Sequence, residues 1–442
     1  MTTSNVFFKA SLVAVSVAVA SSAYSAGFAL NDHSATASGT ALAGAAASGA
    51  DISFSYWNPA LFLNATETTV YVSGAYVMPS MEATVTEASG AAAFGSTDLG
   101  TDVSNDSVND TLVPAIYFAK PLSDSTVAGI SLNVPYGLSG DYGDEWAGRF
   151  HATETSIQDI ALSFSLAHRL NEKLSVGASV QLHQAEVVLA SAVGAPGYEG
   201  DGYIEAEATG YGYSLGALFE PVKGTRIGVG YRSEVDFDFE GDVTYTDVAA
   251  LNAALSGASA GYQLINADVT DSLTFPSVLT ISLDQELTKK LTLGLTAMRT
   301  GWGSMDELRI DYDDDTTDQP DSVLTFGFED QWFYSAGFTY DYSDKLILRT
   351  GVAVDYSPVT DEYRSARTPD GDRTWLSVGG TYNVSDMTSL TFTYTHVMID
   401  DVSVSRDSTD EGTSDEDYSR GDLEADYESS ANVFSLAMNM SF

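Results

Sequence analysis

The sequence predicts an all-β fold: a transmembrane antiparallel β-barrel of about 14 strands, with an N-terminal plug inside its lumen. Three observations lead to this prediction. Apolar residues alternate with small or polar ones, short and long connections follow each other in turn, and a segment without alternation precedes the first strand. No apolar run of about 18 residues follows the first 25 positions, which excludes a helical membrane span.

The alternation is clearest in the last segment of the chain. One face carries only large apolar residues: Phe434, Leu436, Met438, Met440 and Phe442. The other face carries only small or polar residues: Ser435, Ala437, Asn439 and Ser441. Successive side chains of a strand point to opposite faces. A soluble sandwich turns the apolar face inward and a membrane barrel turns it to lipid, so one strand does not distinguish the two.

The connections between strands favour the barrel. Fourteen strands are expected, at 69–85, 110–122, 126–140, 155–170, 174–192, 210–222, 225–245, 272–287, 290–312, 325–342, 346–359, 372–384, 388–406 and 431–442. Six of the thirteen connections are short turns, and seven are longer acidic loops that alternate with them. A barrel of the Gram-negative outer membrane has short periplasmic turns and long outer loops. Because lipid cannot solvate backbone groups, the sheet must close.

The chain divides into three predicted parts. Residues 1–25 read as a secretory signal, with Lys9, a short apolar core and small residues before the expected cleavage site. Residues 26–67 form the expected plug, and residues 68–442 the barrel. Residues 34–50 are almost wholly Ala, Gly, Ser and Thr, without the charge typical of a disordered tail, the alternative interpretation. A lumen of this width needs such a plug to prevent leakage.

Composition excludes several functions. The formal net charge of −43 makes a nucleic-acid partner untenable, because phosphates would be repelled. The acidic stretches are interpreted as solvated outer loops, with divalent-cation binding as the alternative. The five His residues lack metal-ligand spacing, and no nucleophile elbow is present. We therefore expect no metal, no cofactor and no enzymatic activity, with an outer-membrane lipid-acting enzyme as the alternative from another class.

Short motifs in order along the chain resemble the FadL family of outer-membrane long-chain fatty acid transporters. They are Ala26–Asn31 (AGFALN), Asn58-Pro59-Ala60, Pro135-Tyr136-Gly137-Leu138, Trp146–Phe150 (WAGRF), Tyr231–Val235 (YRSEV), Ser357-Pro358-Val359 and Pro369–Arg373 (PDGDR). The resemblance implies a plugged barrel of fourteen strands that takes up hydrophobic compounds passively, most of all long-chain fatty acids, and releases them sideways near the third strand. A close alternative is uptake of neutral or aromatic hydrocarbons. The expected partners are the hydrophobic substrate, outer-membrane lipid and lipopolysaccharide, and the barrel-assembly machinery.

The resemblance also suggests site residues. Phe28 is a candidate for lining or gating the pocket, or for ordinary packing of the plug. Asn58, Pro59 and Ala60 are candidates for the turn where plug meets wall. Pro135, followed by Tyr136 and Gly137, predicts a break in the third strand because proline cannot donate to the sheet. We expect this break to contribute to a lateral opening, with a simple strand end near the rim as the alternative.

The carboxylate-binding group is less clear from the sequence. Basic residues hold the carboxylate in related fatty-acid carriers, yet the corresponding positions appear as Glu186 and Glu329 here. The remaining basic candidates in outer segments are Arg149, Arg364, Arg367 and Arg373. Structural pairing with the many acids is the alternative role for each of them.

Overall fold

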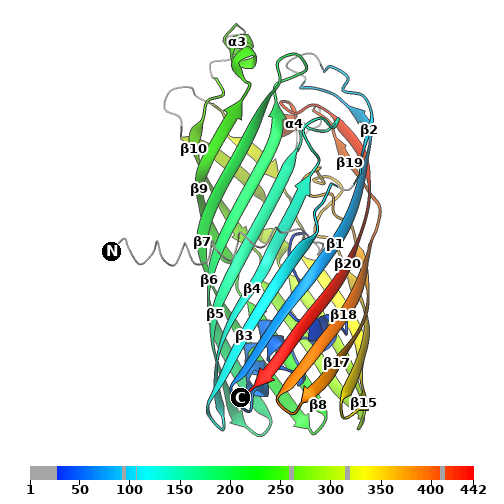
Figure 1. The fold of residues 1–442 in the computed structure, drawn as a ribbon. Coiled ribbons are helices and arrows are strands. Elements are labelled where there is room, and N and C mark those ends of the chain that lie inside the picture. The colour runs from blue at the N-terminus through cyan, green and yellow to red at the C-terminus, as the bar shows by residue number, and fades with distance from the viewer. Residues whose placement is uncertain (1–26, 92–95, 106, 258–262, 314–318, 409–413) are drawn as a thin grey trace, which may run out of the picture.

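The computed structural model describes residues 27–442 except 92–95, 106, 258–262, 314–318 and 409–413. The predicted signal at 1–25 lies outside the described residues. The strands form one closed antiparallel barrel (Figure 1), which confirms the predicted fold class. Within the described ranges, no helix has both the length and the apolar character to cross a membrane.

The barrel has fourteen strand positions. In chain order they are β1 (Thr69–Ala88), β3 (Thr111–Ser123), β4 (Thr126–Asp141), β5 (Glu154–Asn171), β6 (Leu174–Val193), β7 (Gly200–Val222), β8/β9 (Thr225–Arg232, Val235–Thr246), β10/β11 (Ala267–Phe275, Val278–Thr288), β12/β13 (Leu291–Thr300, Glu307–Asp313), β15 (Gln331–Ser343), β16 (Leu346–Asp355), β17 (Arg373–Ser385), β18/β19 (Thr388–Ile399, Val402–Arg406) and β20 (Leu423–Ser441). Two short strands, β2 (Asp102–Asn105) and β14 (Ser322–Thr325), flank β1 and β13. β1 pairs with β20 from Thr69–Ser441 to Ala88–Leu423, which closes the sheet.

The apolar face of the strands points outward in the half of the barrel that carries the short turns. On β20, Leu436 is 63% exposed whereas its neighbour Ser435 is 1% exposed. Phe164 and Val180 on β5 and β6 are exposed in the same way. A soluble fold would bury these side chains, so the outward apolar face marks the surface that contacts lipid.

Several strands are longer than the sequence predicted. β7 begins at Gly200 rather than 210, and β20 begins at Leu423 rather than 431. In these outer portions the polar face turns outward: Glu205 and Glu207 of β7 are exposed, and Ala208 is buried. The lipid-facing pattern therefore stops where the barrel leaves the membrane, although the sheet continues.

The plug lies inside the lumen and contacts opposite walls. It contains α2 (Ala35–Ser38), η1 (Ile52–Tyr56) and η2 (Pro59–Asn64), each capped at its N-terminus by a side chain of Ser34, Asp51 or Asn58. Helix α2 packs on β17, β18 and β20, and η2 packs on β4 to β7. Figure 1 shows these blue segments within the end of the barrel that holds the C-terminus.

The backbone of the plug touches the backbone of the wall. A methyl group on Gly228 would overlap the carbonyl oxygen of Ala46, and one on Gly230 would overlap that of Trp57. The plug amides of Gly44 and Ala46 also donate hydrogen bonds to wall hydroxyls, at 3.0 Å to Thr296 and 2.9 Å to Ser282. Glycine at these wall positions therefore permits the close approach that seals the lumen.

Candidate functional site

An aromatic cluster surrounds the first described residues of the plug. Phe28 is fully buried, and its ring centroid lies 4.8 Å from that of Trp302, 5.4 Å from Phe275 and 6.0 Å from Tyr136. All three contacts are edge-to-face, the geometry that aromatic rings prefer. The Tyr136 hydroxyl donates to the carbonyl of Pro276 at 2.8 Å. Phe28 and Tyr136 are thus brought together from segments over 100 residues apart in the sequence.

Apolar side chains extend this cluster into the outer half of the lumen. They come mainly from β6, β7, β9, β10 and β13 and include Val187, Leu189, Phe237, Phe239, Val269, Leu308 and Ile310. A small cavity of about 20 Å³ remains between several of them. An apolar lining with few polar groups is typical of a site for hydrophobic ligands.

The alternation of residues along β9 predicts this apolar lining, although the sequence analysis did not identify it. On β9, Val235, Phe237 and Phe239 are buried, whereas Asp236 and Asp238 between them are exposed. A lipid-facing surface cannot carry a row of carboxylates, so the apolar face of such a strand must point into the lumen. The inverted alternation therefore marks the inner lining.

Strand β4 is irregular at Pro135, as its proline predicts. Pairing with β5 shifts register between Asn133 and Tyr136, so β4 holds one extra residue there, which is a β-bulge. Pairing of β4 with β3 runs from the turn only to Leu132, opposite Ile116. Beyond that pair, no ladder joins β3 and β4 in the described part of the chain, so backbone pairing in the wall is interrupted at this place.

The start of the plug fills this weak place. The amide of Leu30 donates to the carbonyl of Pro135, and the amide of Gly137 donates to the carbonyl of Phe28, both at 2.8 Å. Ala29 forms an antiparallel bridge with Tyr136. Residues 28–30 thus act as a short strand beside β4, and Phe28 of this segment also contacts the aromatic cluster.

A second cavity, of about 50 Å³, lies next to the plug start on its outer side. Gly27, Leu138, Arg367, Asp370 and Arg373 are among its lining residues. Asp370 forms a buried ion pair with Arg373 and accepts a hydrogen bond from the amide of Gly27 at 2.9 Å. The predicted residue Arg373 therefore lies beside the plug start, where it holds an acid that anchors the plug.

Two further candidate arginines, Arg149 and Arg364, have structural partners. Arg149 pairs with Glu199 at 2.7 Å in the outer loops. Arg364 is buried, pairs with Asp361 at 2.6 Å, and donates to the carbonyls of Asp370 and Ser403.

Glu186 and Glu329 do not line either cavity. Both residues are exposed, and Glu186 points outward from β6 between buried Ala185 and Val187. The alternation of faces along β6 decides the orientation of Glu186. Neither acid therefore lies where a basic residue would bind a substrate carboxylate in the lumen.

Asn58, Pro59 and Ala60 lie apart from the aromatic cluster, where the plug meets β6 and β7. The Asn58 amide donates to the carbonyls of Ala46 at 2.7 Å and Ala217 at 3.0 Å, and its oxygen accepts from the amide of Ala60. Pro59 and Ala60 press against Gly177. These contacts join plug to wall.

Sequence reasoning also missed a buried polar group beneath the cluster. His183 and Asp159 form a fully buried pair at 2.9 Å on β6 and β5. The Arg232 guanidinium lies 4.2 Å from the ring centre of Tyr56 in the plug. Among described atoms, Nε2 of His183 and Nε of Arg232 have no hydrogen-bond partner. These residues place unpaired polar atoms beside the apolar cluster, where the His183 ring lies 6.2 Å from that of Phe237.

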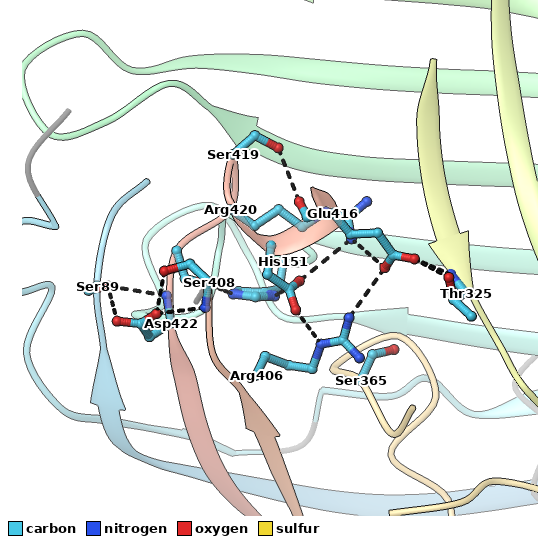
Figure 2. Close-up of polar contacts among 12 residues, drawn as sticks. Ser89, His151, Thr325, Ser365, Arg406, Ser408, Glu416, Ser419, Arg420 and Asp422 are labelled. Carbon is cyan, nitrogen blue, oxygen red and sulfur yellow. Dashed lines mark hydrogen bonds and ion pairs between the residues drawn. The ribbon is translucent and has the colours of Figure 1, made fainter. Parts of the chain in front are cut away.

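An ion network lies among the outer segments of the barrel (Figure 2). Arg406 of β19 pairs with Glu416 at 3.2 Å and with Asp417 at 2.8 Å, both in helix α4 (Ser414–Asp417). Arg420 also pairs with Glu416, at 3.3 Å. His151, from the loop before β5, donates through Nε2 to the carbonyl of Gly421 at 3.0 Å.

Burial dominates the electrostatics of this network. It lowers the pKa of His151 to about 3, with a further lowering from Arg420 and Arg406. Burial also raises the pKa of Asp417. Within the described residues, no group of three or more His, Asp or Glu side chains is arranged to hold a metal ion.

The closed barrel with an apolar cluster in its lumen, an internal plug and an interrupted wall strand defines a class: outer-membrane channels for hydrophobic compounds. Residues 16–442 match the family described as outer membrane protein transport protein (OMPP1/FadL/TodX). The chain belongs to this family. It is a transport protein of the outer membrane and not an enzyme, so the lipid-acting alternative is excluded.

Three relatives illustrate the likeness. The long-chain fatty acid transport protein of Escherichia coli O6:H1 (strain CFT073) is 29% identical over 417 residues, covering 88% of this chain and 91% of the relative. The crystal structure of a Pseudomonas aeruginosa FadL homologue superposes with a TM-score of 0.83 at 22% identity, covering 94% of this chain and 100% of the other. The Pseudomonas putida toluene transporter TodX gives 0.65 at 15% identity, covering 95% and 100%. These two structures support the fold.

Proposed function

We propose that this protein takes up long-chain fatty acids passively and releases them sideways through the wall between β3 and β4. The observation that carries the proposal is the position of the plug start. Residues 28–30 occupy the break in β4 and at the same time cover the apolar cluster around Phe28. One displacement of this segment would connect the site with the surrounding lipid.

The energetics suit such a route. Burial of an acyl chain stabilises it by roughly 0.8 kcal/mol per CH₂. The two cavities of about 20 and 50 Å³ are small, so substrate must displace Phe28 or its neighbours to enter. Entry and opening are thereby coupled, and the gradient of substrate supplies the driving force.

Uptake of neutral or aromatic hydrocarbons is the second candidate. The rings of Phe28, Tyr136, Phe275 and Trp302 offer an aromatic lining that suits such compounds. Fatty acids remain the first candidate because the curated relatives with 26–29% identity over most of the chain include several named long-chain fatty acid transport proteins.

Labelled oleate uptake tests the proposal. Cells that lack their own fatty acid transporter are compared with and without this gene, and labelled toluene is measured in parallel. Gene-dependent uptake of oleate is expected. Gene-dependent uptake of toluene without uptake of oleate would replace the first candidate by the second.

A further inference from the structure

We propose that a hollow on the lipid-facing side of β4, β5 and β6 binds an anionic glycerophospholipid of the periplasmic leaflet. One acyl chain of the lipid lies in the hollow, and its phosphate lies near Lys120. Because this site is on the outside of the wall, it does not depend on which compound the lumen carries.

The hollow is formed by large and small side chains on the outer face of three neighbouring strands. Its lining includes two rows across these strands: Ile130, Phe164 and Val180, then Ala128, Leu166 and Ala178. The two alanines leave space on both sides of Leu166. The volume of the hollow is about 510 Å³, far larger than either lumen cavity. An apolar hollow of this size on the surface that contacts lipid fits an acyl chain.

The lysines of the protein are confined to the end of the barrel that carries the short turns. All six lysines after the predicted signal lie in or close to these turns: Lys120, Lys173, Lys223, Lys289, Lys290 and Lys345. All six are exposed, and the ion pairs of the described residues use arginine or histidine instead. The short turns face the periplasm. Unpaired lysine charge is therefore available to the periplasmic leaflet, where basic groups attract anionic lipids.

Lys120 places one of these charges at the edge of the hollow. It follows Phe118 on the lipid-facing side of β3 and lies opposite Ala128, which lines the hollow. The next residue on this side of β3 is Leu122, so the neighbours of Lys120 on the lipid face are apolar. A lysine in such a place buries its stem beside lipid and turns its ammonium group to the membrane surface. The ammonium group can therefore contact the phosphate of a lipid whose acyl chain fills the hollow.

A second polar group borders the hollow from the other side. His168 lies two residues past Leu166 on the lipid-facing side of β5, and its Nδ1 shares a hydrogen bond of 2.9 Å with Oγ1 of Thr126. This bond holds the ring, and within the described chain Nε2 of His168 has no hydrogen-bond partner. Lys120 and His168 thus flank the periplasmic edge with a charge and a polar ring. A zwitterionic headgroup would bring its own cation towards Lys120, so an anionic headgroup is favoured.

Native mass spectrometry of the purified full barrel in detergent tests the site with two probes. Dioleoyl phosphatidylglycerol and dioleoyl phosphatidylcholine have the same acyl chains, but only the first carries a net negative charge. Lys120→Gln removes the charge at the edge, and Ala178→Trp fills the hollow. The matched controls are Lys345→Gln, in the turn between β15 and β16, and Ala297→Trp, on the lipid-facing side of β12 beside Tyr334. Heat-dependent unfolding of each variant verifies the fold.

The unaltered protein is expected to bind phosphatidylglycerol about fivefold or more tightly than phosphatidylcholine. Lys120→Gln should remove most of this preference, and Ala178→Trp should weaken both lipids to a similar degree. Neither control should change binding by more than about twofold. The assignment is overturned if the unaltered protein shows no preference, if Lys120→Gln has no larger effect than Lys345→Gln, or if Ala178→Trp binds both lipids unchanged.

Two other occupants of the hollow give different results in the same experiment. If the hollow took released substrate, oleate at equal concentration would displace phosphatidylglycerol. If it took a second barrel, the unaltered protein would appear as a dimer and Ala178→Trp as a monomer. Either result overturns the phospholipid assignment, whereas a lipid-bound monomer that resists oleate supports it.

Discussion

Buried charged residues in the outer loops are held by partners from distant parts of the chain. His151 precedes β5, whereas Gly421, which accepts its hydrogen bond, precedes β20. His151 is 6% exposed and is kept neutral by burial and by two nearby arginines. A proton on this ring would therefore be costly as long as the loops stay closed.

Acid should loosen the outer loops through His151. The pKa of the closed state, about 3, lies below the ordinary value of 6.5, so the open state binds the extra proton. The stabilising contribution is complete above pH 6.5 and is lost as the pH falls towards 3. The population of open loops, measured by hydrogen exchange, should increase on the order of 30-fold between pH 7.5 and pH 5.

His151→Gln is the control for this pH effect. Glutamine can still donate to the carbonyl of Gly421 but does not titrate. The raised pKa of Asp417 acts in the opposite direction, but Asp417 is present in both proteins, so the comparison of the two isolates the effect of His151. An equally steep pH dependence in the variant would contradict the role of His151.

At the scale of elements, β4 differs from its neighbours. β5, β6 and β7 pair over most of their length, whereas β4 loses β3 beyond Leu132 and bulges at Val134-Pro135. The plug start replaces the missing neighbour through Leu30, which packs among Val77, Val113 and Val134. The break is therefore covered by a segment of the plug and not by a neighbouring strand of the wall.

Pro135→Thr should impair substrate uptake and leave the barrel folded. Threonine restores an N–H group and favours a regular strand, which would extend pairing and reduce the bulge. Initial oleate uptake is expected to fall several-fold, on the order of tenfold, if the bulge serves the lateral passage.

The matched control is Pro79→Thr in β1, where Pro79 pairs regularly with Ala431. Heat-dependent unfolding of both variants reports on the barrel itself. Uptake by the Pro135 variant at the rate of the unaltered protein would remove Pro135 from the passage.

At the scale of the whole molecule, the closed wall and the internal plug have separate structural roles. The ladder from β1 round to β20 satisfies the backbone groups that face lipid, and the plug closes the lumen. Wall glycines such as Gly228 and Gly230 let the two backbones touch. The seal depends on the absence of side chains at these positions.

Gly230→Ala should make the barrel leak. The added methyl group would overlap the carbonyl of Trp57, and overpacking of this kind costs about 1–3 kcal/mol, which the plug can avoid by moving. We expect increased conductance in planar bilayers. Gly74→Ala, where the methyl group meets only the flexible Leu112 side chain at 3.3 Å, should leave conductance unchanged. If the two variants had the same conductance, the proposed role of Gly230 in sealing the lumen would be contradicted.

The sequence predicted the barrel because its determinants are local. Alternation and turn residues act over a few positions, so fourteen strands and the proline break at Pro135 could be recognised in advance. The outer extensions of β7 and β20 were missed because the lipid signal ends where the membrane ends. The partners of Phe28, by contrast, come from β4, β10 and the segment after β12, and no local pattern joins them.

The sequence by itself therefore determined that a closed, lipid-facing sheet forms, since each strand must turn one apolar face to the membrane. Only the tertiary structure decided which side chains meet within the lumen. It placed Phe28 in the break of β4, turned Glu186 away from the pocket, and left Arg367 without a described acid partner. Those outcomes depend on strand register and on the path of the plug, which are properties of the closed barrel rather than of any one segment.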